Sequence, residues 1–268
     1  MITELNEPYP LTPVLPVRFR ESGFIKLKNI FSRAILDHYG REISAQVQQR
    51  NTLTKPMHER NTYEKAFLQI MNLWETSPVA KEFVFGKRLA RLAAELMGVR
   101  GVRLYHDQAL YKEPGGGMTP WHADQYYWPV STENTITAWI PLQPTPLEMG
   151  PLAFSSGSHK YNVGRELEIS DDSEKRISKE LLERGLPQEK SAFDLGEVSF
   201  HFGWTFHRAG TNRSPDPRRV MTVIYVEDGC HVIAPKNKNH VNDLARWMPG
   251  FKPGYLVDSA LNPVLYRG

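Results

Sequence analysis

The sequence has few of the features that mark secreted, membrane or disulfide-stabilised proteins. Cys230 is its single cysteine, which excludes an internal disulfide and a cysteine-rich zinc site. No apolar run reaches the roughly 18 residues that a membrane-spanning helix needs. The polar start, which several prolines interrupt, predicts neither a secretory nor a transit peptide. We therefore expect a cytoplasmic protein with no membrane partner.

The chain also lacks a strong charge of either sign. It has 33 basic and 30 acidic residues, and the two signs alternate along almost its whole length. Proteins that bind nucleic acid usually concentrate positive charge in one patch or stripe. We therefore expect no nucleic-acid partner. No internal repeat is present, and the oligomeric state is left open.

The composition of the 268 residues is typical of a globular protein with a full hydrophobic core, and the length favours one domain over residues 1–268. Within it we expect a helix-rich N-terminal support over 1–98 and a strand-rich core over 99–230. A charged, solvated helical insertion over 160–190 interrupts that core. Residues 231–268 form a C-terminal extension.

The N-terminal third shows mostly helical periodicity. A short strand is predicted over 23–30, and Ser32 is placed to cap an amphipathic helix that follows it. Two further helices are predicted over 63–75 and 77–97. Gly98 ends the second of them, because glycine favours the left-handed conformation at a helix C-terminus.

After Gly98 the chain becomes rich in β-branched and aromatic residues. Runs such as VRLYHDQALYK, NTITAWIPL, GEVSFHF and RRVMTVIYVEDG are separated by Gly, Pro, Asn and Asp. The spacing does not fit alternating strands and helices. It predicts an antiparallel sandwich or a jelly-roll barrel.

The first chemically informative motif is His122-Ala123-Asp124. Residues two apart on a strand point to the same side, so both side chains can face a barrel interior. A lone His-x-Asp pair is weak evidence, but a second cluster follows at His207, with Arg218 eleven residues further on. Two histidines and one carboxylate form the facial triad of non-haem Fe(II) oxygenases. A turn between two strands can bring Arg218 to the same cavity, where its fork-shaped cation suits a carboxylate.

These motifs resemble the phytanoyl-CoA dioxygenase (PhyH)-like family of Fe(II)/2-oxoglutarate-dependent oxygenases. The resemblance covers about residues 108–227. The matching stretches are Gln108-x-Leu110-x-Lys112-x-Pro114-Gly115 before His122-x-Asp124; Thr137-Ala138-Trp139-Ile140-Pro141-Leu142 with Gly150-Pro151-Leu152 and Gly157-Ser158-His159; and His207 with Gly210, Asn212 and Arg218.

The resemblance implies a mainly β fold with flanking helices, built on a double-stranded β-helix (a jelly-roll, cupin-like core). It implies that His122, Asp124 and His207 bind Fe(II) and that Arg218 pairs with the distal carboxylate of 2-oxoglutarate. It also places a set of residues around the cosubstrate: Gln108, Lys112, Trp128, Thr137 and Trp139.

Two further positions bear on how the metal and the cosubstrate are bound. Several relatives carry a hydroxyl two residues after the distal histidine, where this chain has Ala209, so Thr137 or a water is expected to replace it. His201 is the alternative third ligand. We favour His207, because the residue eleven after His201 is Asn212 and not an arginine.

The expected reaction uses O2 to convert 2-oxoglutarate to succinate and CO2 while a C–H bond of a small organic molecule is hydroxylated. Relatives that halogenate have a small residue where this chain has Asp124, so chlorination is not expected. Tyr126, Tyr127 and Trp128 are candidates for the substrate wall. The substrate stays open, as does the choice between hydroxylation, desaturation and cyclisation. The alternatives are a non-catalytic metal-binding jelly roll or a macromolecule demethylase that uses the same triad.

Overall fold

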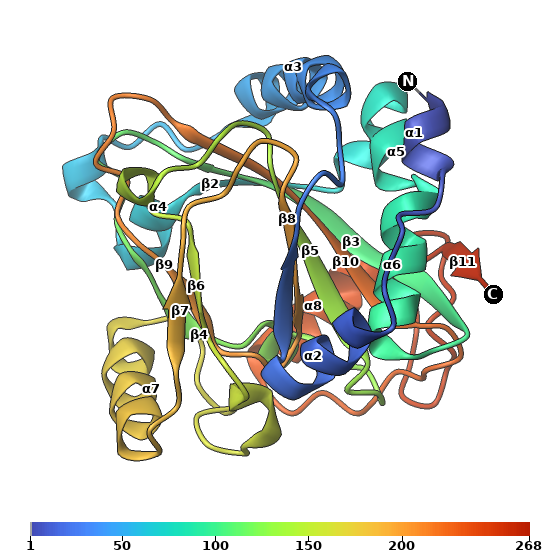
Figure 1. Cartoon of the computed structure of the whole chain (residues 1–268). Helices are drawn as coiled ribbons and strands as arrows, with labels where there is room; N and C mark the ends of the chain where they lie inside the picture. Colours follow the sequence, from blue (N-terminus) through green and yellow to red (C-terminus); the bar gives the residue numbers. More distant parts are fainter. Residues whose placement is uncertain (1) are drawn as a thin grey trace.

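The computed structural model describes residues 2–268 and contains two antiparallel β-sheets that face each other (Figure 1). The larger, seven-stranded sheet has the order β1 (Phe24–Leu27), β8 (Val198–Phe202), β5 (Thr135–Pro141), β10 (Arg218–Glu227), β3 (Gly101–Lys112) and β11 (Val264–Arg267), and β2 (Leu68–Met71) also pairs with β3. The smaller, four-stranded sheet has the order β4 (Thr119–His122), β9 (His207–Ala209), β6 (Leu152–Ser155) and β7 (Gln188–Lys190). The predicted jelly-roll core is confirmed, as two separate sheets and not a closed barrel.

The helices lie around this pair of sheets. The α-helices are α1 (Ile2–Asn6), α2 (Val14–Ser22), α3 (Arg33–Arg50), α4 (Thr62–Ala66), α5 (Pro78–Val84), α6 (Lys87–Met97), α7 (Asp171–Glu183) and α8 (Lys238–Trp247). Short 3-10 helices are η1 (Met57–Glu59), η2 (Leu73–Glu75), η3 (Asp124–Tyr127), η4 (Leu147–Met149) and η5 (Ser158–Lys160). Among residues 2–268, no helix combines the length and the apolar character needed to span a membrane.

The larger sheet is buried on both faces, which explains why its strands read as continuous apolar runs. On the outer face, Ile140 and Met221 belong to the main core under the N-terminal helices, and α6 contacts β3, β5 and β10. On the inner face, Trp139 and Val220 pack toward the smaller sheet. Figure 1 shows α5 and α6 on one side of the larger sheet and the smaller sheet on the other. The helices therefore support the sheet from behind, and its inner face is left for a site.

The N-terminal predictions hold in part. Ser32 caps α3 by accepting a hydrogen bond from the Ile35 amide at 3.4 Å, and Gly98 ends α6 with a φ of 75°. The helix predicted over 63–75 is wrong. The chain leaves α4 at Phe67, where φ is −170°, and then forms β2 along β3. Edge pairing with β3 outweighs a short helical pattern, and short apolar runs do not distinguish the two states.

The single helix predicted over 77–97 is also wrong, because the chain forms two helices there. Helix α5 ends at Val84 and α6 begins at Lys87, with Gly86 between them. A Cβ atom at Gly86 would lie 3.1 Å from the Leu5 carbonyl oxygen and 3.2 Å from that of Phe83. The break therefore lets α1 approach closely.

The insertion contains the predicted helix, α7, but this helix is not only solvated. Ile177 and Leu181 pack with Trp121 and Phe206 in a small core beside the smaller sheet. The Trp121 amide donates a hydrogen bond to Glu174 at 2.8 Å. Because Trp121 precedes His122, α7 supports the strand that carries the first candidate ligand.

The packing of α7 can be tested through the free energy of unfolding, with a neighbouring leucine as the control. Leu181 is fully buried and its neighbour Leu182 is 78% exposed. Leu181→Ala is expected to lower the free energy of unfolding by about 2–5 kcal/mol, because it leaves a cavity. Leu182→Ala is expected to change it by less than about 0.5 kcal/mol. Denaturant unfolding of both variants measures the difference, and equal effects would contradict the packing of α7.

Candidate metal centre and cosubstrate cavity

A cavity of about 450 Å³ opens between the two sheets, and the three predicted metal ligands line it. His122 ends β4 and His207 begins β9, and these residues are cross-strand partners in the smaller sheet. Asp124 follows from η3. The three side chains offer ligand atoms that all lie within 4.8 Å of one another. The structure therefore brings together the three residues that the sequence motifs selected.

Asp124 reaches this site in a slightly different way from the one expected. We predicted that His122 and Asp124 share a strand, but β4 ends at His122 and Asp124 begins η3. Ala123 between them is extended, with φ −124° and ψ 127°. The alternation of side chains therefore continues for one residue past the strand, and both residues face the cavity.

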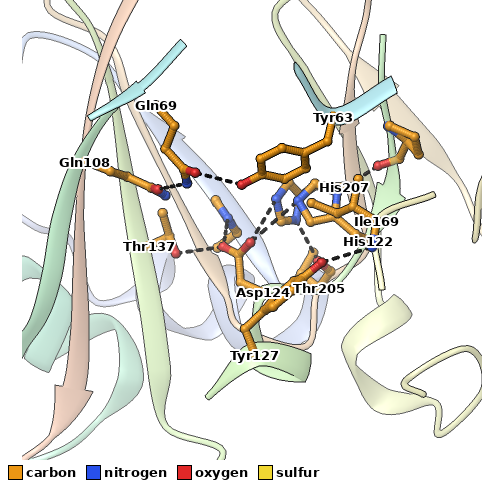
Figure 2. A network of polar contacts seen from close by, with 12 residues as sticks. Tyr63, Gln69, Gln108, His122, Asp124, Tyr127, Thr137, Ile169, Thr205 and His207 are labelled. Carbon is orange, nitrogen blue, oxygen red and sulfur yellow. Dashed lines mark hydrogen bonds and ion pairs between the residues drawn. The ribbon is translucent and has the colours of Figure 1, made fainter. Parts of the chain in front are cut away.

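Hydrogen bonds orient both histidine rings toward the same point. The Nδ1 atom of His122 lies 2.7 Å from the Pro120 carbonyl oxygen, and that of His207 lies 3.0 Å from the Thr205 carbonyl oxygen. Each Nδ1 therefore carries the proton, which leaves Nε2 free to bind a metal. Both Nε2 atoms lie 3.6 Å from Asp124 Oδ1 (Figure 2).

The pKa values of Asp124 and His207 are both shifted toward the deprotonated forms that bind a metal. Burial alone would raise the pKa of Asp124, but the neighbouring histidines outweigh it and hold this pKa well below its usual value. The pKa of His207 is also lowered well below its usual value, first by burial and then by the other two histidines. An ionised carboxylate beside a neutral imidazole is the form that metals bind.

The second carboxylate oxygen of Asp124 has its own partners. Thr137 donates a hydrogen bond to Oδ2 at 3.0 Å (Figure 2). His201 Nε2 lies 3.3 Å from the same atom. Thr137 and His201 therefore orient Asp124. Within residues 2–268, the group that fits a metal consists of His122, Asp124 and His207, without His201.

Arg218 lines the same cavity as a buried cation without a counter-charge. Its side chain is 1% exposed, and its Nη1 donates a hydrogen bond to the Gly150 carbonyl at 2.5 Å. Its Nε atom is buried without a partner, and no ion pair in the described chain involves this residue. Burial lowers the pKa of Arg218 to about 9, so it stays charged at neutral pH. An uncompensated buried guanidinium suits an anionic ligand such as a carboxylate.

The route by which Arg218 reaches the cavity differs from the one expected. His207 and Arg218 do not lie on a strand pair joined by a turn, because β9 belongs to the smaller sheet and β10 to the larger one. The two residues therefore face each other across the sandwich. Arg219 points to the other side of β10, as predicted, and donates a hydrogen bond to Gln143.

Lys112 is the cross-strand partner of Arg218 and is fully buried, but it is not among the residues that line the cavity. Its ammonium donates to the Gly117 carbonyl and lies 3.5 Å from the Thr119 hydroxyl. Burial and, second, the charge of Arg218 lower the pKa of Lys112 to about 6. Lys112, which the resemblance placed around the cosubstrate, is therefore not in the cavity wall, but it contacts Thr119, which is.

Thr119 was not identified from the sequence, and its side chain carries a hydroxyl close to Ala209. It is the cross-strand partner of Ala209, and both residues line the cavity with Arg218. Thr137, which with a water was one of the two expected replacements for that hydroxyl, donates instead to Asp124. The register of two adjacent strands, which no local motif reveals, therefore places a hydroxyl opposite Ala209.

Most of the other residues predicted for the pocket line the cavity. Those that line the cavity are Gln108, Thr137, Trp139, Tyr127 and Trp128. Tyr126 does not line it, and its carbonyl accepts from His240 of α8. Trp139 lies against the guanidinium of Arg218, with 5.3 Å between the ring centre and Cζ.

The side of the cavity away from Arg218 is built from segments without a recognisable motif. Tyr63 donates a hydrogen bond to Gln69 at 2.7 Å, and the Gln69 amide donates to Gln108 at 2.5 Å (Figure 2). Tyr127 accepts from the Ile169 amide at 2.9 Å. Further lining residues from the core and from α8 are His106, Asn239, Asp243 and Arg246. The N-terminal support, the insertion and the C-terminal extension thus meet over the metal ligands.

Comparison with known proteins places this geometry in a family. The family model "Phytanoyl-CoA dioxygenase (PhyH)" matches residues 19–220. A probable alpha-ketoglutarate-dependent hypophosphite dioxygenase of Stutzerimonas stutzeri is 28% identical over 147 residues, which are 53% of this chain and 51% of that protein. The chain therefore spans about half the length of this curated relative.

Solved structures share the fold at low identity. The alpha ketoglutarate-dependent carbocyclase SnoK from nogalamycin biosynthesis has 21% identity and a TM-score of 0.77, over 97% of this chain and 99% of that one. The epimerase SnoN, solved with Fe3+, alpha ketoglutarate and nogalamycin RO, has 21% identity and a TM-score of 0.79, over 94% and 98%. EctD from S. alaskensis has 20% identity and a TM-score of 0.67, over 83% and 81%.

These findings agree with the cofactors predicted from the sequence. The Stutzerimonas relative is named as alpha-ketoglutarate-dependent, the SnoN structure holds iron and alpha ketoglutarate, and this chain carries a matching set of two histidines and one aspartate. The family model covers most of the chain, including all three candidate ligands. The resemblance seen in the sequence is therefore confirmed, and the chain belongs to the phytanoyl-CoA dioxygenase (PhyH) family of iron- and 2-oxoglutarate-dependent dioxygenases.

Proposed function

We propose that this chain hydroxylates a C–H bond of a small organic molecule, with 2-oxoglutarate converted to succinate and CO2. The observation that carries the proposal is that three metal ligands and an uncompensated buried arginine line one cavity. When bound, iron and 2-oxoglutarate supply the oxidising chemistry from O2. We propose that residues 1–268 act as one domain in the cytoplasm, where Cys230 stays a free buried thiol.

Each residue has a defined task in this proposal. His122, Asp124 and His207 would hold Fe(II), with room left for 2-oxoglutarate and O2 to bind it. Thr137 and His201 fix the Asp124 carboxylate through Oδ2. Such partners of ligands typically change metal affinity about 10- to 100-fold.

The other end of the cavity supports the cosubstrate. Arg218 would bind the distal carboxylate, with the Gly150 carbonyl and the ring of Trp139 holding its guanidinium. The buried Nε of Arg218 has no partner, so the residue keeps hydrogen-bonding capacity for a ligand. The residues present therefore fit a dicarboxylate that would lie between Arg218 and the metal ligands.

Thr119 gives a sharp test of this end of the cavity. Thr119→Val keeps the shape of the side chain and removes the hydroxyl. We expect the dissociation constant of 2-oxoglutarate to rise about 10-fold or more, because a hydrogen bond to a charged group is worth about 1.5–3 kcal/mol. Adding Ala209→Ser on the paired strand should recover part of the loss. An unchanged constant in Thr119→Val would contradict the role of this hydroxyl.

The walls of the cavity favour an organic substrate over a small inorganic anion. Aromatic and apolar side chains line the side away from Arg218, among them Tyr63, Tyr127, Trp128 and Met71. The named activity of the Stutzerimonas relative makes hypophosphite the second candidate substrate.

Two alternative functions are less well supported. The presence of the triad and Arg218 argues against a non-catalytic jelly roll, and the interspersed charge argues against a macromolecular substrate.

The test is a screen of small organic molecules and hypophosphite for substrate-dependent succinate release, followed by mass spectrometry of the products. An organic product that gains one oxygen atom supports the proposed hydroxylation, whereas oxygen gain by hypophosphite alone supports the second candidate. Loss of two hydrogen atoms from the substrate indicates desaturation or cyclisation, and an unchanged mass indicates epimerisation. Either of these results would overturn the proposed reaction while leaving the family assignment in place.

A further inference from the structure

Helix α8 contributes a carboxylate to the cavity that the proposed reaction does not use. Asp243 lines the cavity together with Arg246, which lies three residues later on the same helix. Asp243 is partly buried, and its Oδ2 accepts a hydrogen bond from the Tyr105 hydroxyl at 3.0 Å. Neither residue is a metal ligand or an expected 2-oxoglutarate contact.

Asp243 forms no direct ion pair in the described chain, and the charge of Arg246 acts on it from beyond ion-pair distance. The ion pairs of residues 2–268 include none with Asp243, although carboxylates that face a cavity are usually paired. Burial raises the pKa of Asp243 to about 7. Arg246 is exposed and lies over the ring of Trp247, with 4.5 Å between Cζ and the ring centre. An unpaired carboxylate on a ligand cavity is a candidate for ligand binding.

The groups around Asp243 do not replace a cation. His106 lines the cavity and is 4% exposed, but its Nδ1 has no hydrogen-bond partner and burial lowers the pKa of His106 to about 4. The ring is therefore neutral. Glu168, the other acid on this side, is already paired with Lys238 at 3.5 Å and accepts from Asn239 at 3.0 Å. Asp243 is therefore the carboxylate on this side that forms no direct ion pair in the described chain.

We propose that Asp243 is a substrate-binding residue and that the substrate carries a protonated amine, which pairs with this carboxylate while the rest of the molecule extends toward the metal. This inference rests on the proposed function, because it assumes that the substrate occupies the side of the cavity away from Arg218. The amine would supply the direct ion-pair partner that Asp243 lacks in the described chain. Tyr105 would hold the carboxylate in place from behind.

The experiment compares fragments that differ only in their head group. The full chain is loaded with Zn(II), which accepts the same ligands and is diamagnetic, and with 2-oxoglutarate. Dissociation constants of butylamine, butanol and butyrate are then measured by ligand-observed NMR. We expect butylamine to bind about 10-fold or more tightly than butanol, because its charge-assisted hydrogen bond is the stronger one.

Three variants separate recognition from structure. Asp243→Asn keeps an acceptor for Tyr105 and should abolish the preference for butylamine. Tyr105→Phe keeps the carboxylate and should retain the preference, as should Arg246→Gln. If Asp243 only supported Tyr105, Tyr105→Phe and Asp243→Asn would behave alike, and that result would overturn the proposal.

The wild-type comparison is decisive even if one variant does not fold. Tightest binding of butyrate would assign the recognition to Arg246 and overturn the proposal. Equal or absent binding of the three fragments would also overturn it, provided that 2-oxoglutarate still binds. Failure of 2-oxoglutarate itself to bind would instead contradict the proposed function.

Discussion

Asp124→Ala is expected to abolish 2-oxoglutarate turnover and to weaken Fe(II) binding more than about 100-fold. Residues that only orient a metal ligand cost about 10- to 100-fold when removed, and Asp124 is a candidate ligand itself. Its Oδ1 lies 3.6 Å from the Nε2 atoms of both His122 and His207, so the alanine leaves two neutral donors and no negative charge. Metal titration and succinate release measure the two effects.

Thr137→Val is the graded control for this substitution. It removes the hydrogen bond to Asp124 Oδ2 but leaves all three ligands, so a loss of about 10-fold in metal affinity is expected. An Asp124→Ala variant that binds Fe(II) and releases succinate like the wild type would remove this residue from the metal site.

The second large effect is expected for Arg218→Ala, which should raise the dissociation constant of 2-oxoglutarate about 30-fold to 5,000-fold. Removing one partner of a buried charge pair costs about 2–5 kcal/mol. Arg218 is 1% exposed and has no acidic partner in the described chain, so its loss leaves the incoming carboxylate without a cation. Fe(II) affinity should stay within a few fold, because Arg218 is not a metal ligand.

Arg219→Ala provides the matched control, since Arg219 is the next residue and carries the same charge. Its side chain donates to Gln143 on the opposite face of β10. We expect the 2-oxoglutarate affinity of Arg219→Ala to be close to that of the wild type. Similar losses in the two variants would point to a general charge effect and would contradict a specific contact with Arg218.

Part of the fold could be predicted because its signals are local. Ser32, Gly98 and the β-branched runs after residue 100 depend on neighbours in the sequence, and they led to the correct caps and fold class. The strand at Leu68–Met71 depends on the free edge of β3, which lies some forty residues further along the chain. A four-residue apolar run does not encode that partner, so helical periodicity misled the prediction.

The candidate site divides in the same way. His122, Asp124, His207 and Arg218 could be selected because spacing and residue type indicate their chemistry. Thr119 could not, because its role depends on its register opposite Ala209. The residues over the metal ligands come from three distant segments and carry no motif: Tyr63, Gln69, Ile169, Asp243 and Arg246. Only the tertiary fold brings them together, so the sequence predicted Tyr127 and Trp128 in the cavity wall but not these residues.

The most direct test of the account is the visible spectrum of the protein with Fe(II) and 2-oxoglutarate in the absence of oxygen, recorded for the wild type and for Arg218→Ala. We expect a weak charge-transfer band in the wild type and the need for far more 2-oxoglutarate to produce it in the variant. A wild type without the band would contradict the proposed iron and 2-oxoglutarate site. A band that forms equally well in both proteins would contradict the role of Arg218.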